Sequence, residues 1–138
     1  MDLAQPTKQY HTNSTTVYSC QYHIIFCPKY RRKVLINGID DTLKQLILDK
    51  QDEYGYTVIE QEIMSDHVHL LLDIDPTKYG VNDVIRKIKG YTAHELREQY
   101  PQLKSRLPSL WTRSKFISTC GTVNLQTVQA YIENQKGK

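Results

Sequence analysis

The alternation of apolar and polar residues along the chain predicts strands and helices in the order β-α-β-β-α-β-α. Strands are predicted where β-branched and aromatic residues cluster between turn residues, and helices where apolar residues recur every three or four positions. The predicted strands cover residues 17–27, 56–64, 67–74 and 116–120. The predicted helices cover residues 39–54, 81–100 and 124–136.

Turn and capping residues mark several of the expected boundaries. Gly55 is the expected stop of the first helix, because glycine readily adopts the left-handed conformation that follows many helices. Ser65 and Asp66 are expected to join the second and third strands as a short antiparallel hairpin. The second helix contains Gly90, where it could be interrupted, and Asn124 is the expected N-cap of the last helix.

The order β-α-β-β-α-β matches the ferredoxin-like (RRM-like) split βαβ fold, which is built on an antiparallel sheet. The last helix is then an addition at the C-terminus, and the fold class is α+β. A length of 138 residues fits one domain, and the chain contains no internal repeat or Pro/Gly-rich linker. We therefore expect an N-terminal arm over residues 1–16 and a single domain over residues 17–138.

Composition indicates a globular protein of a reducing compartment. No apolar run is long enough to cross a bilayer, and the polar N-terminus lacks the core of a signal peptide. The cysteines are odd in number and lack the paired spacing of a metal finger, so we expect reduced thiols at Cys20, Cys27 and Cys120. These features predict a cytoplasmic protein with no membrane partner.

Charge is distributed unevenly, although the net charge is only +3. Residues 1–33 carry a net charge of +4, residues 34–75 carry −8 and residues 76–138 carry +7. Two basic stretches could converge in the fold and track a nucleic-acid backbone, or they could simply be solvated surface. The candidate DNA-binding residues are Lys29, Arg31, Arg32, Lys33, Arg86, Lys87 and Lys89.

The triplet His67-Val68-His69 is the first motif that indicates chemistry. Strand side chains alternate between faces, so the two histidines point the same way and their imidazoles can reach one cation. The alternative is a pair of ordinary strand histidines satisfied by hydrogen bonds. Asp66 could orient a ligating imidazole, or it could be a simple turn residue.

Tyr131 and Gln135 form the second candidate pair, one helical turn apart on the same helix face. A tyrosine phenol can attack phosphorus and store the bond energy in a phosphotyrosine link. Its solution pKa of about 10 makes it a weak nucleophile unless a cation or base assists. Gln135 offers a neutral oxygen ligand. Taken alone, a tyrosine near a C-terminal helix end is more often a packing residue.

Five stretches together resemble the single-tyrosine HUH transposases of the insertion-sequence 200/605 family. They are YHIIFCPKYR at residues 22–31, DHVHLL at 66–71, LW at 110–111, FISTCGTV at 116–123 and YIENQ at 131–135. They occur in the order typical of that family and cover nearly the whole chain from residue 18 onward. The combination is far more specific than any single stretch.

The resemblance implies a role for each residue of the two candidate pairs. His67, His69 and Gln135 would be metal ligands for Mg²⁺ or Mn²⁺, and Tyr131 would be the nucleophile. The family also implies a ferredoxin-like HUH domain and a homodimer in which the tyrosine helix can complete the partner's active site. The substrate would be single-stranded DNA at transposon ends, located through hairpins and cleaved to a 5′-phosphotyrosine and a free 3′-hydroxyl.

The sequence departs from the family pattern at two positions and leaves three alternative functions to weigh. Ser65 stands where the family usually has proline, and Cys120 stands where valine is common. A histidine-triad hydrolase is disfavoured because Leu71 occupies its third histidine position. A dimeric ferredoxin-like nucleic-acid-binding protein with a structural metal remains an alternative. So does a domesticated relative that acts on host repeats.

Overall fold

The structure of the chain is a computed structural model that describes residues 10–119 and 125–138, and only the backbone of residues 125–127. Three sequence-based predictions concern positions outside these residues. They are the first part of the N-terminal arm, the reduced thiol of Cys120 and the N-cap at Asn124.

Four antiparallel strands form the main sheet in the order β4-β5-β3-β6. The bounds of these strands are β3 Gln21–Phe26, β4 Tyr56–Met64, β5 His67–Ile74 and β6 Phe116–Thr119. The first and third of them in chain order lie side by side at the centre, and the second and fourth lie at the edges. This arrangement confirms the predicted ferredoxin-like split βαβ fold of the α+β class.

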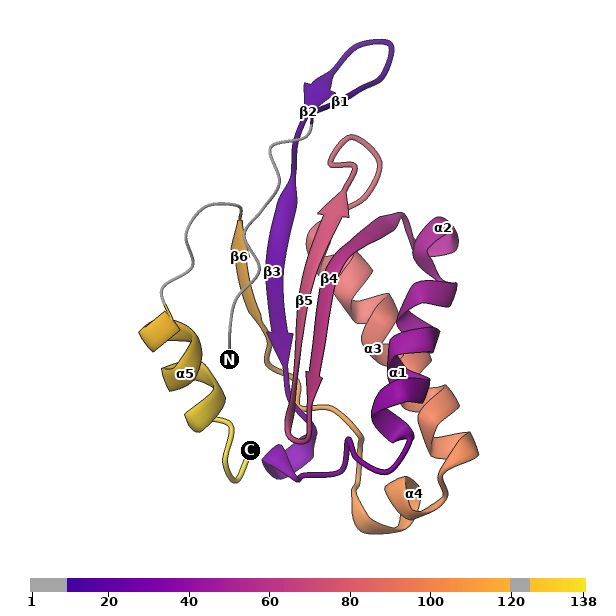
Figure 1. Cartoon of the computed structure of the whole chain (residues 1–138), viewed down its shortest axis with the longest axis vertical. Coiled ribbons are helices and arrows are strands. Elements are labelled where there is room, and N and C mark those ends of the chain that lie inside the picture. Colours follow the sequence, from indigo (N-terminus) through magenta and orange to yellow (C-terminus); the bar gives the residue numbers. More distant parts are fainter. Residues whose placement is uncertain (1–9, 120–124) are drawn as a thin grey trace.

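Helices cover both faces of the sheet. Their bounds are α1 Ile39–Asp49, α2 Gln51–Tyr54, α3 Val81–Gln99, α4 Gln102–Arg106 and α5 Leu125–Glu133. Figure 1 shows α1 to α4 gathered on one side of the sheet and α5 alone on the other. Within the described residues, none of the helices is both long and apolar enough to span a membrane.

The helices differ from the prediction in three respects. The predicted helix over residues 39–54 is two helices, because the backbone leaves the helical conformation at Lys50. Gly90 does not interrupt α3, which is continuous. The last helix ends at Glu133, so Gln135 lies in the turn that follows it rather than on the helix.

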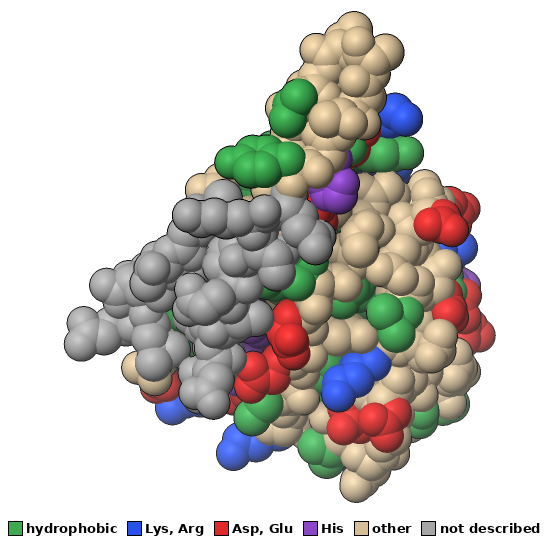
Figure 2. All heavy atoms as spheres, turned by 45° about the horizontal axis from the view of Figure 1, so that its top comes forward, with side chains coloured by type: hydrophobic (Ala, Val, Ile, Leu, Met, Phe, Trp, Pro, Cys, Tyr) green, Lys and Arg blue, Asp and Glu red, His purple; other side chains and the backbone are tan. Residues whose placement is uncertain are grey.

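The predicted strand over residues 17–27 is wrong in its first part, which belongs to a separate small hairpin. This hairpin consists of β1 (His11–Thr12) paired with β2 (Val17–Tyr18). In Figure 1 it lies at the top of the view, and the space-filling view of Figure 2 shows it projecting from the body. Only β3 enters the main sheet.

Turn chemistry that the sequence analysis did not recognise closes this hairpin. The side-chain oxygen of Asn13 accepts hydrogen bonds from the backbone N–H groups of Thr15 and Thr16, at 3.0 and 2.8 Å. Asparagine and threonine are typical of such turns, because a short polar side chain can replace a backbone acceptor. The hairpin is docked on the main sheet by His11 Nε2, which lies 2.7 Å from Asp73 Oδ2.

The hydrophobic core lies between the sheet and the helices α1 and α3. Alternate residues of the central strands point into it, as expected for a strand with two different faces, and they include Ile24, Phe26, Val68, Leu70 and Leu72. The ring of Phe26 meets that of Trp111 edge to face at 4.8 Å between centroids. Trp111 Nε1 donates a hydrogen bond of 3.1 Å to Thr92 Oγ1 of α3, which satisfies the one polar group of that buried side chain.

The pairing register decides which residues point to the opposite face, toward α5. Ile25 lies directly opposite His69 of β5 on one side and Phe116 of β6 on the other. Directly opposed residues of antiparallel strands place their side chains on the same face. The histidines of β5 therefore point away from the main core and toward the layer that contains α5.

Two glycines are expected to respond in opposite ways to substitution by alanine. Gly55 has a φ of +82°, and a Cβ there would collide with the ring of Tyr79. Gly55→Ala should lower the free energy of unfolding by at least about 2 kcal/mol, because it adds backbone strain and a steric clash. Gly90→Ala should raise it by about 0.5–1 kcal/mol, because its Cβ would meet open space on a helix.

Urea unfolding of the two variants and the original chain measures both effects. An unchanged stability of Gly55→Ala, or a loss of stability in Gly90→Ala, would contradict this account of the two positions.

Candidate functional site

The two histidines of β5 present unpaired nitrogen atoms inside the protein. His67 and His69 are 9% and 1% exposed. Their atoms His67 Nε2 and His69 Nδ1 are buried, and neither has a hydrogen-bond partner among residues 10–119 and 128–138. Buried polar atoms are nearly always satisfied, so an unsatisfied pair on one face of a strand calls for a ligand or a catalytic role. This observation favours the predicted metal role over that of ordinary strand histidines.

The other nitrogen of each ring is held by a neighbouring side chain. His67 Nδ1 lies 2.8 Å from Asp66 Oδ1, so Asp66 orients this ring as well as forming the turn. His69 Nε2 lies 3.0 Å from Nδ1 of His23, and the two rings are nearly parallel. Such contacts fix the orientation of an imidazole and decide which nitrogen can bind a cation.

His23 is a member of the site that the sequence analysis missed. It is 1% exposed and lies on β3, the strand that pairs with β5. In the sequence, His23 is indicated only by its position two residues before Ile25, which places both side chains on the same face of the strand. The contact with His69 depends on the register between two strands far apart in the chain, which the sequence does not specify.

Burial keeps His69 neutral. Burial, and after it the charges of His23 and His67, lower the pKa of His69 to about 4. Burial likewise lowers the pKa of His23. A neutral imidazole has a free lone pair at physiological pH, which is the form that binds a metal ion.

Tyr131 lies on α5 over the row of residues that contains His69. Its ring centroid is 5.8 Å from that of Phe116 on β6. Across the sheet, Phe116 pairs with Ile25 of β3, and Ile25 pairs with His69 of β5. Its hydroxyl lies 3.0 Å from Ser114 Oγ. Burial raises the pKa of Tyr131, whereas the hydrogen bond with Ser114 opposes that shift. The phenol is therefore protonated at neutral pH in this state of the protein.

Gln135 shares the hydroxyl of Ser114 with Tyr131. Ser114 Oγ donates a hydrogen bond of 2.7 Å to Gln135 Oε1. A serine has only one hydroxyl proton, so the phenol of Tyr131 must be the donor in its own bond to Ser114. Gln135 is 3% exposed, and its Nε2 donates to the backbone oxygen of Tyr131 at 3.4 Å. Sequence analysis missed Ser114, which precedes β6 and belongs to no motif.

The predicted site residues thus form two groups on one face of the sheet. His67 and His69 form the first group, while Tyr131 and Gln135 form the second. No hydrogen bond joins the two groups within the part of the chain that the structure describes, where the second nitrogen of each histidine has no partner. Within the described residues, no three His, Cys, Asp or Glu side chains are grouped so as to hold a metal ion. The predicted third ligand, Gln135, is a glutamine and therefore does not belong to these four residue types.

Arg31 ties the two groups together. Its guanidinium lies 3.3 Å from Asp66 Oδ2, beside His67, and 3.0 Å from Glu133 Oε2 at the end of α5. Arg31 and Tyr30 both have positive φ angles, 51° and 60°. Such angles cost about 1–3 kcal/mol per residue in non-glycine residues and persist where the surroundings require them. The predicted contact of Arg31 with DNA stays a prediction, since these ion pairs already engage the side chain.

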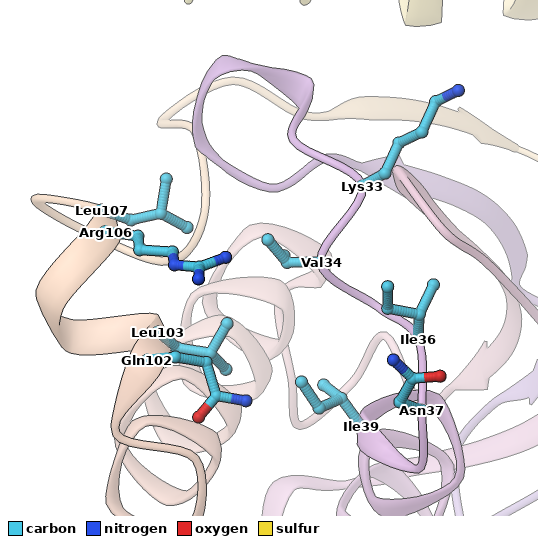
Figure 3. A pocket seen from close by; sticks show the side chains of 9 residues that line it. All are labelled: Lys33, Val34, Ile36, Asn37, Ile39, Gln102, Leu103, Arg106 and Leu107. Atoms are coloured by element: carbon cyan, nitrogen blue, oxygen red, sulfur yellow. The ribbon is translucent and has the colours of Figure 1, made fainter.

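The basic residues after β3 lie at the surface, and some of them line a cavity. This cavity has a volume of about 380 Å³ and lies between residues 33–39 and the segment that carries α4. In Figure 3, Arg106 reaches across it toward Val34, whereas the ammonium group of Lys33 points away. Arg32 lines a neighbouring cavity with Lys33 and Arg106. Lys29 lies over the ring of Tyr30.

The predicted basic residues of α3 have different surroundings. Arg86 is exposed and forms an ion pair of 3.3 Å with Asp83. The ammonium group of Lys87 lies 5.9 Å from the ring centroid of Tyr54. Lys89 is half-buried and donates to the backbone oxygens of residues 112 and 114, at 2.6 and 3.3 Å. Whether any of them contacts DNA stays a prediction.

Comparison with known proteins finds one family along nearly the whole chain. The family model described as "Transposase IS200 like" matches residues 16–135. The ISDra2 transposase TnpA of Deinococcus radiodurans is 40% identical over 124 residues, which are 88% of each chain. The transposase for insertion sequence element IS200 of Salmonella typhimurium is 31% identical over 122 residues, or 87% of this chain and 79% of the relative.

Solved structures agree with the fold. A crystal structure of a candidate transposase from Deinococcus radiodurans R1 matches with a TM-score of 0.81 and 32% identity, covering 93% of this chain and 99% of that chain. A REP-associated tyrosine transposase, solved bound to a REP hairpin, matches with a TM-score of 0.56 and 11% identity over 95% of this chain and 69% of that one. At this identity the second likeness supports the fold alone.

The neutral burial of His69 predicts a specific loss of stability in acid. The unfolded chain takes up a proton on this histidine below its ordinary pKa of 6.5, but the folded protein does so only near 4. The contribution is complete above pH 6.5 and is lost as the pH falls to about 4. With a chelator present, it should amount to about 3 kcal/mol in the free energy of unfolding.

Urea unfolding between pH 7 and pH 4 measures this loss, and the variants His69→Phe and His94→Gln isolate it. His94 is exposed on α3, so the free energy of unfolding of His94→Gln should fall with pH as much as that of the original protein. Between pH 7 and pH 4, the free energy of unfolding of His69→Phe should fall by about 3 kcal/mol less than that of the original protein. Equal declines in all three proteins would contradict the assignment.

Proposed function

The chain belongs to the IS200-like transposase family, and on that premise we propose that it cuts and rejoins single-stranded DNA through a covalent bond to Tyr131. The observation that carries the proposal is the arrangement on one sheet face. A phenol and an amide oxygen share one serine hydroxyl there, and two buried histidine nitrogens on the same face have no hydrogen-bond partner among the described residues.

The residues of this face fit a divalent metal ion. His67 Nε2 and His69 Nδ1 are buried and unsatisfied, and both rings are fixed through their other nitrogen. With the amide oxygen of Gln135 they would hold Mg²⁺ or Mn²⁺. All three ligands are neutral, so the ion would keep its full attraction for a phosphate. Bound there, the ion would polarise the scissile phosphate and stabilise the charge that develops during attack.

Tyr131 supplies the nucleophile. Its oxygen attacks the scissile phosphorus, the phenol proton leaves, and a bond between phosphorus and the phenol oxygen forms. The bond between phosphorus and the 3′-oxygen breaks, and that oxygen takes up a proton to become a free 3′-hydroxyl. The 5′-phosphotyrosine keeps the energy of the broken bond. A 3′-hydroxyl can therefore reverse the step and rejoin strands without an external energy source.

Ser114 and Arg31 position the nucleophile in this scheme. Ser114 accepts the hydrogen bond of the phenol and so limits the directions in which its oxygen can point. Arg31 connects the end of α5 to Asp66, next to the first histidine. Precise alignment of the attacking atom is a large part of enzymatic rate acceleration, so these contacts matter although neither residue reacts.

The proposed DNA partner is a single strand that carries hairpins at the transposon ends. The resemblance to the insertion-sequence 200/605 family supports this choice, and a REP-associated tyrosine transposase of the same fold has been solved with a REP hairpin. We further propose a homodimer, as in that family. A nucleic-acid-binding protein that does not cut would share the fold but form no adduct in the experiment below. A domesticated relative acting on host repeats would keep the same chemistry and differ in the DNA that it recognises.

Replacing Tyr131 by Phe should abolish cleavage and leave DNA binding intact, because only the nucleophilic oxygen is removed. The assay is incubation of labelled hairpin-bearing single strands with Mn²⁺, followed by denaturing electrophoresis to detect a protein–DNA adduct. Tyr30→Phe is the matched control, since Tyr30 is 41% exposed and outside the site. An adduct that persists in Tyr131→Phe would refute the assignment. Retarded bands in a native gel, without any adduct in the denaturing gel of the original protein, would indicate a protein that binds DNA and does not cut it.

Removal of a proposed ligand should weaken metal binding in the absence of DNA. His67→Ala and Gln135→Ala are each expected to lower the affinity for Mn²⁺ at least about tenfold, because each removes one of three protein ligands. Titration calorimetry or electron paramagnetic resonance measures the affinity directly. His94→Ala and Gln45→Ala, both exposed positions, are the controls. Unchanged affinity in the first pair would place the metal elsewhere.

A further inference from the structure

A small cavity beside the segment that carries Ser114 is lined mostly by basic side chains. It has a volume of about 260 Å³ and lies between the first half of α3 and the segment before β6. Its lining consists of Asn82, Ile85, Arg86, Lys89, Arg113 and Lys115. Four of these six residues are cationic and none is acidic. Two of the four, Arg113 and Lys115, belong to no recognised motif and were not among the predicted DNA-binding residues.

The positive charge of this cavity is poorly compensated. Within the described part of the chain, neither Arg113 nor Lys115 forms an ion pair, and the pair between Arg86 and Asp83 is exposed and therefore weak. Burial, together with the nearby charge of Lys115, lowers the pKa of Lys89 to about 8. Cations that repel one another in this way gain free energy when an anion enters between them.

The cavity and Tyr131 share one short segment, residues 112–115. Lys89 donates to the backbone oxygens of residues 112 and 114 from the side of α3. Ser114 Oγ contacts the hydroxyl of Tyr131 from the other side. Lys115 lines the cavity, whereas the next residue, Phe116, packs against the ring of Tyr131. A ligand in the cavity would therefore bear directly on the segment that positions the nucleophile.

We propose that this cavity binds a backbone phosphate of the DNA strand close to the scissile phosphate. The proposal rests on the proposed function, since it assigns part of the same substrate. Four cations and no aromatic ring suit a phosphate rather than a base, because bases are held by stacking. Phosphate contacts fix the register of a protein along a strand. The cavity thus helps to set which bond lies opposite Tyr131.

The test is a scan with uncharged methylphosphonates, placed one at a time along a single strand that spans the cleavage site. Binding is measured with the full-length protein and with the double variant Arg113→Gln/Lys115→Gln. In the original protein, one position near the scissile phosphate should weaken binding about tenfold, as expected when a charge-assisted hydrogen bond is removed. In the double variant, a methylphosphonate at that position should cause no further loss of affinity.

Salt dependence supplies a second, independent measurement. For single strands, the slope of log affinity against log salt falls by about 0.7 for each phosphate that the protein no longer neutralises. The double variant should show such a fall on the unmodified strand. Lys44→Gln/Lys104→Gln removes the same charge from exposed positions on α1 and α4 and should leave the slope unchanged. Urea unfolding verifies that both double variants are folded.

The outcomes separate this inference from the proposed function. The phosphate site is overturned if the effect of every methylphosphonate on binding is the same with and without Arg113 and Lys115. It is also overturned if both double variants lower the salt slope equally. The adduct of Tyr131 in the original protein is a separate readout of the cleavage proposal. An adduct without a dependent position would leave cleavage standing and remove only the cavity's role.

Discussion

The register between β3 and β5 is the constraint on which the site depends. It places Ile25 opposite His69 and brings His23 to the ring of that histidine. Strand side chains alternate with a period of two, so a slip by one residue would turn both histidines of β5 into the main core. The apolar residues on the other face of the same strands, which pack under α1 and α3, prevent that slip. The core on the opposite face of the sheet thus fixes the geometry of the site.

Burying the ring of His69 without a hydrogen-bonded carboxylate has a cost. The neutral form of His69 is favoured by its burial, and its ring is held by a second histidine rather than by a carboxylate. The carboxylate of Asp66, which contacts His67, forms an ion pair with Arg31, and Arg31 also reaches the end of α5. One strained arginine therefore neutralises the turn before the histidines and anchors the helix of the proposed nucleophile.

A second set of contacts links Tyr131, the proposed nucleophile, to the basic cavity on the side of α3. Lys89 holds the backbone of the segment before β6, and Ser114 in that segment holds the hydroxyl of Tyr131 and the amide of Gln135. The Oε1 atom of Gln135 that accepts the Ser114 hydrogen bond is also the proposed metal ligand. A metal ion held there would therefore be connected to Tyr131 through the single side chain of Ser114.

The sequence by itself determined the elements of the sheet and the composition of the two candidate pairs. Local periodicity was enough to place His67 and His69 on one strand face. It also predicted that Tyr131 and Gln135 lie close together, although Gln135 lies in the turn after α5 rather than on the helix. It could not supply His23, Ser114 or the ion pairs of Arg31, because each of these contacts joins residues far apart in the chain. Only the tertiary structure decided those, since strand register and helix docking are set by the packing of the whole core rather than by any local pattern.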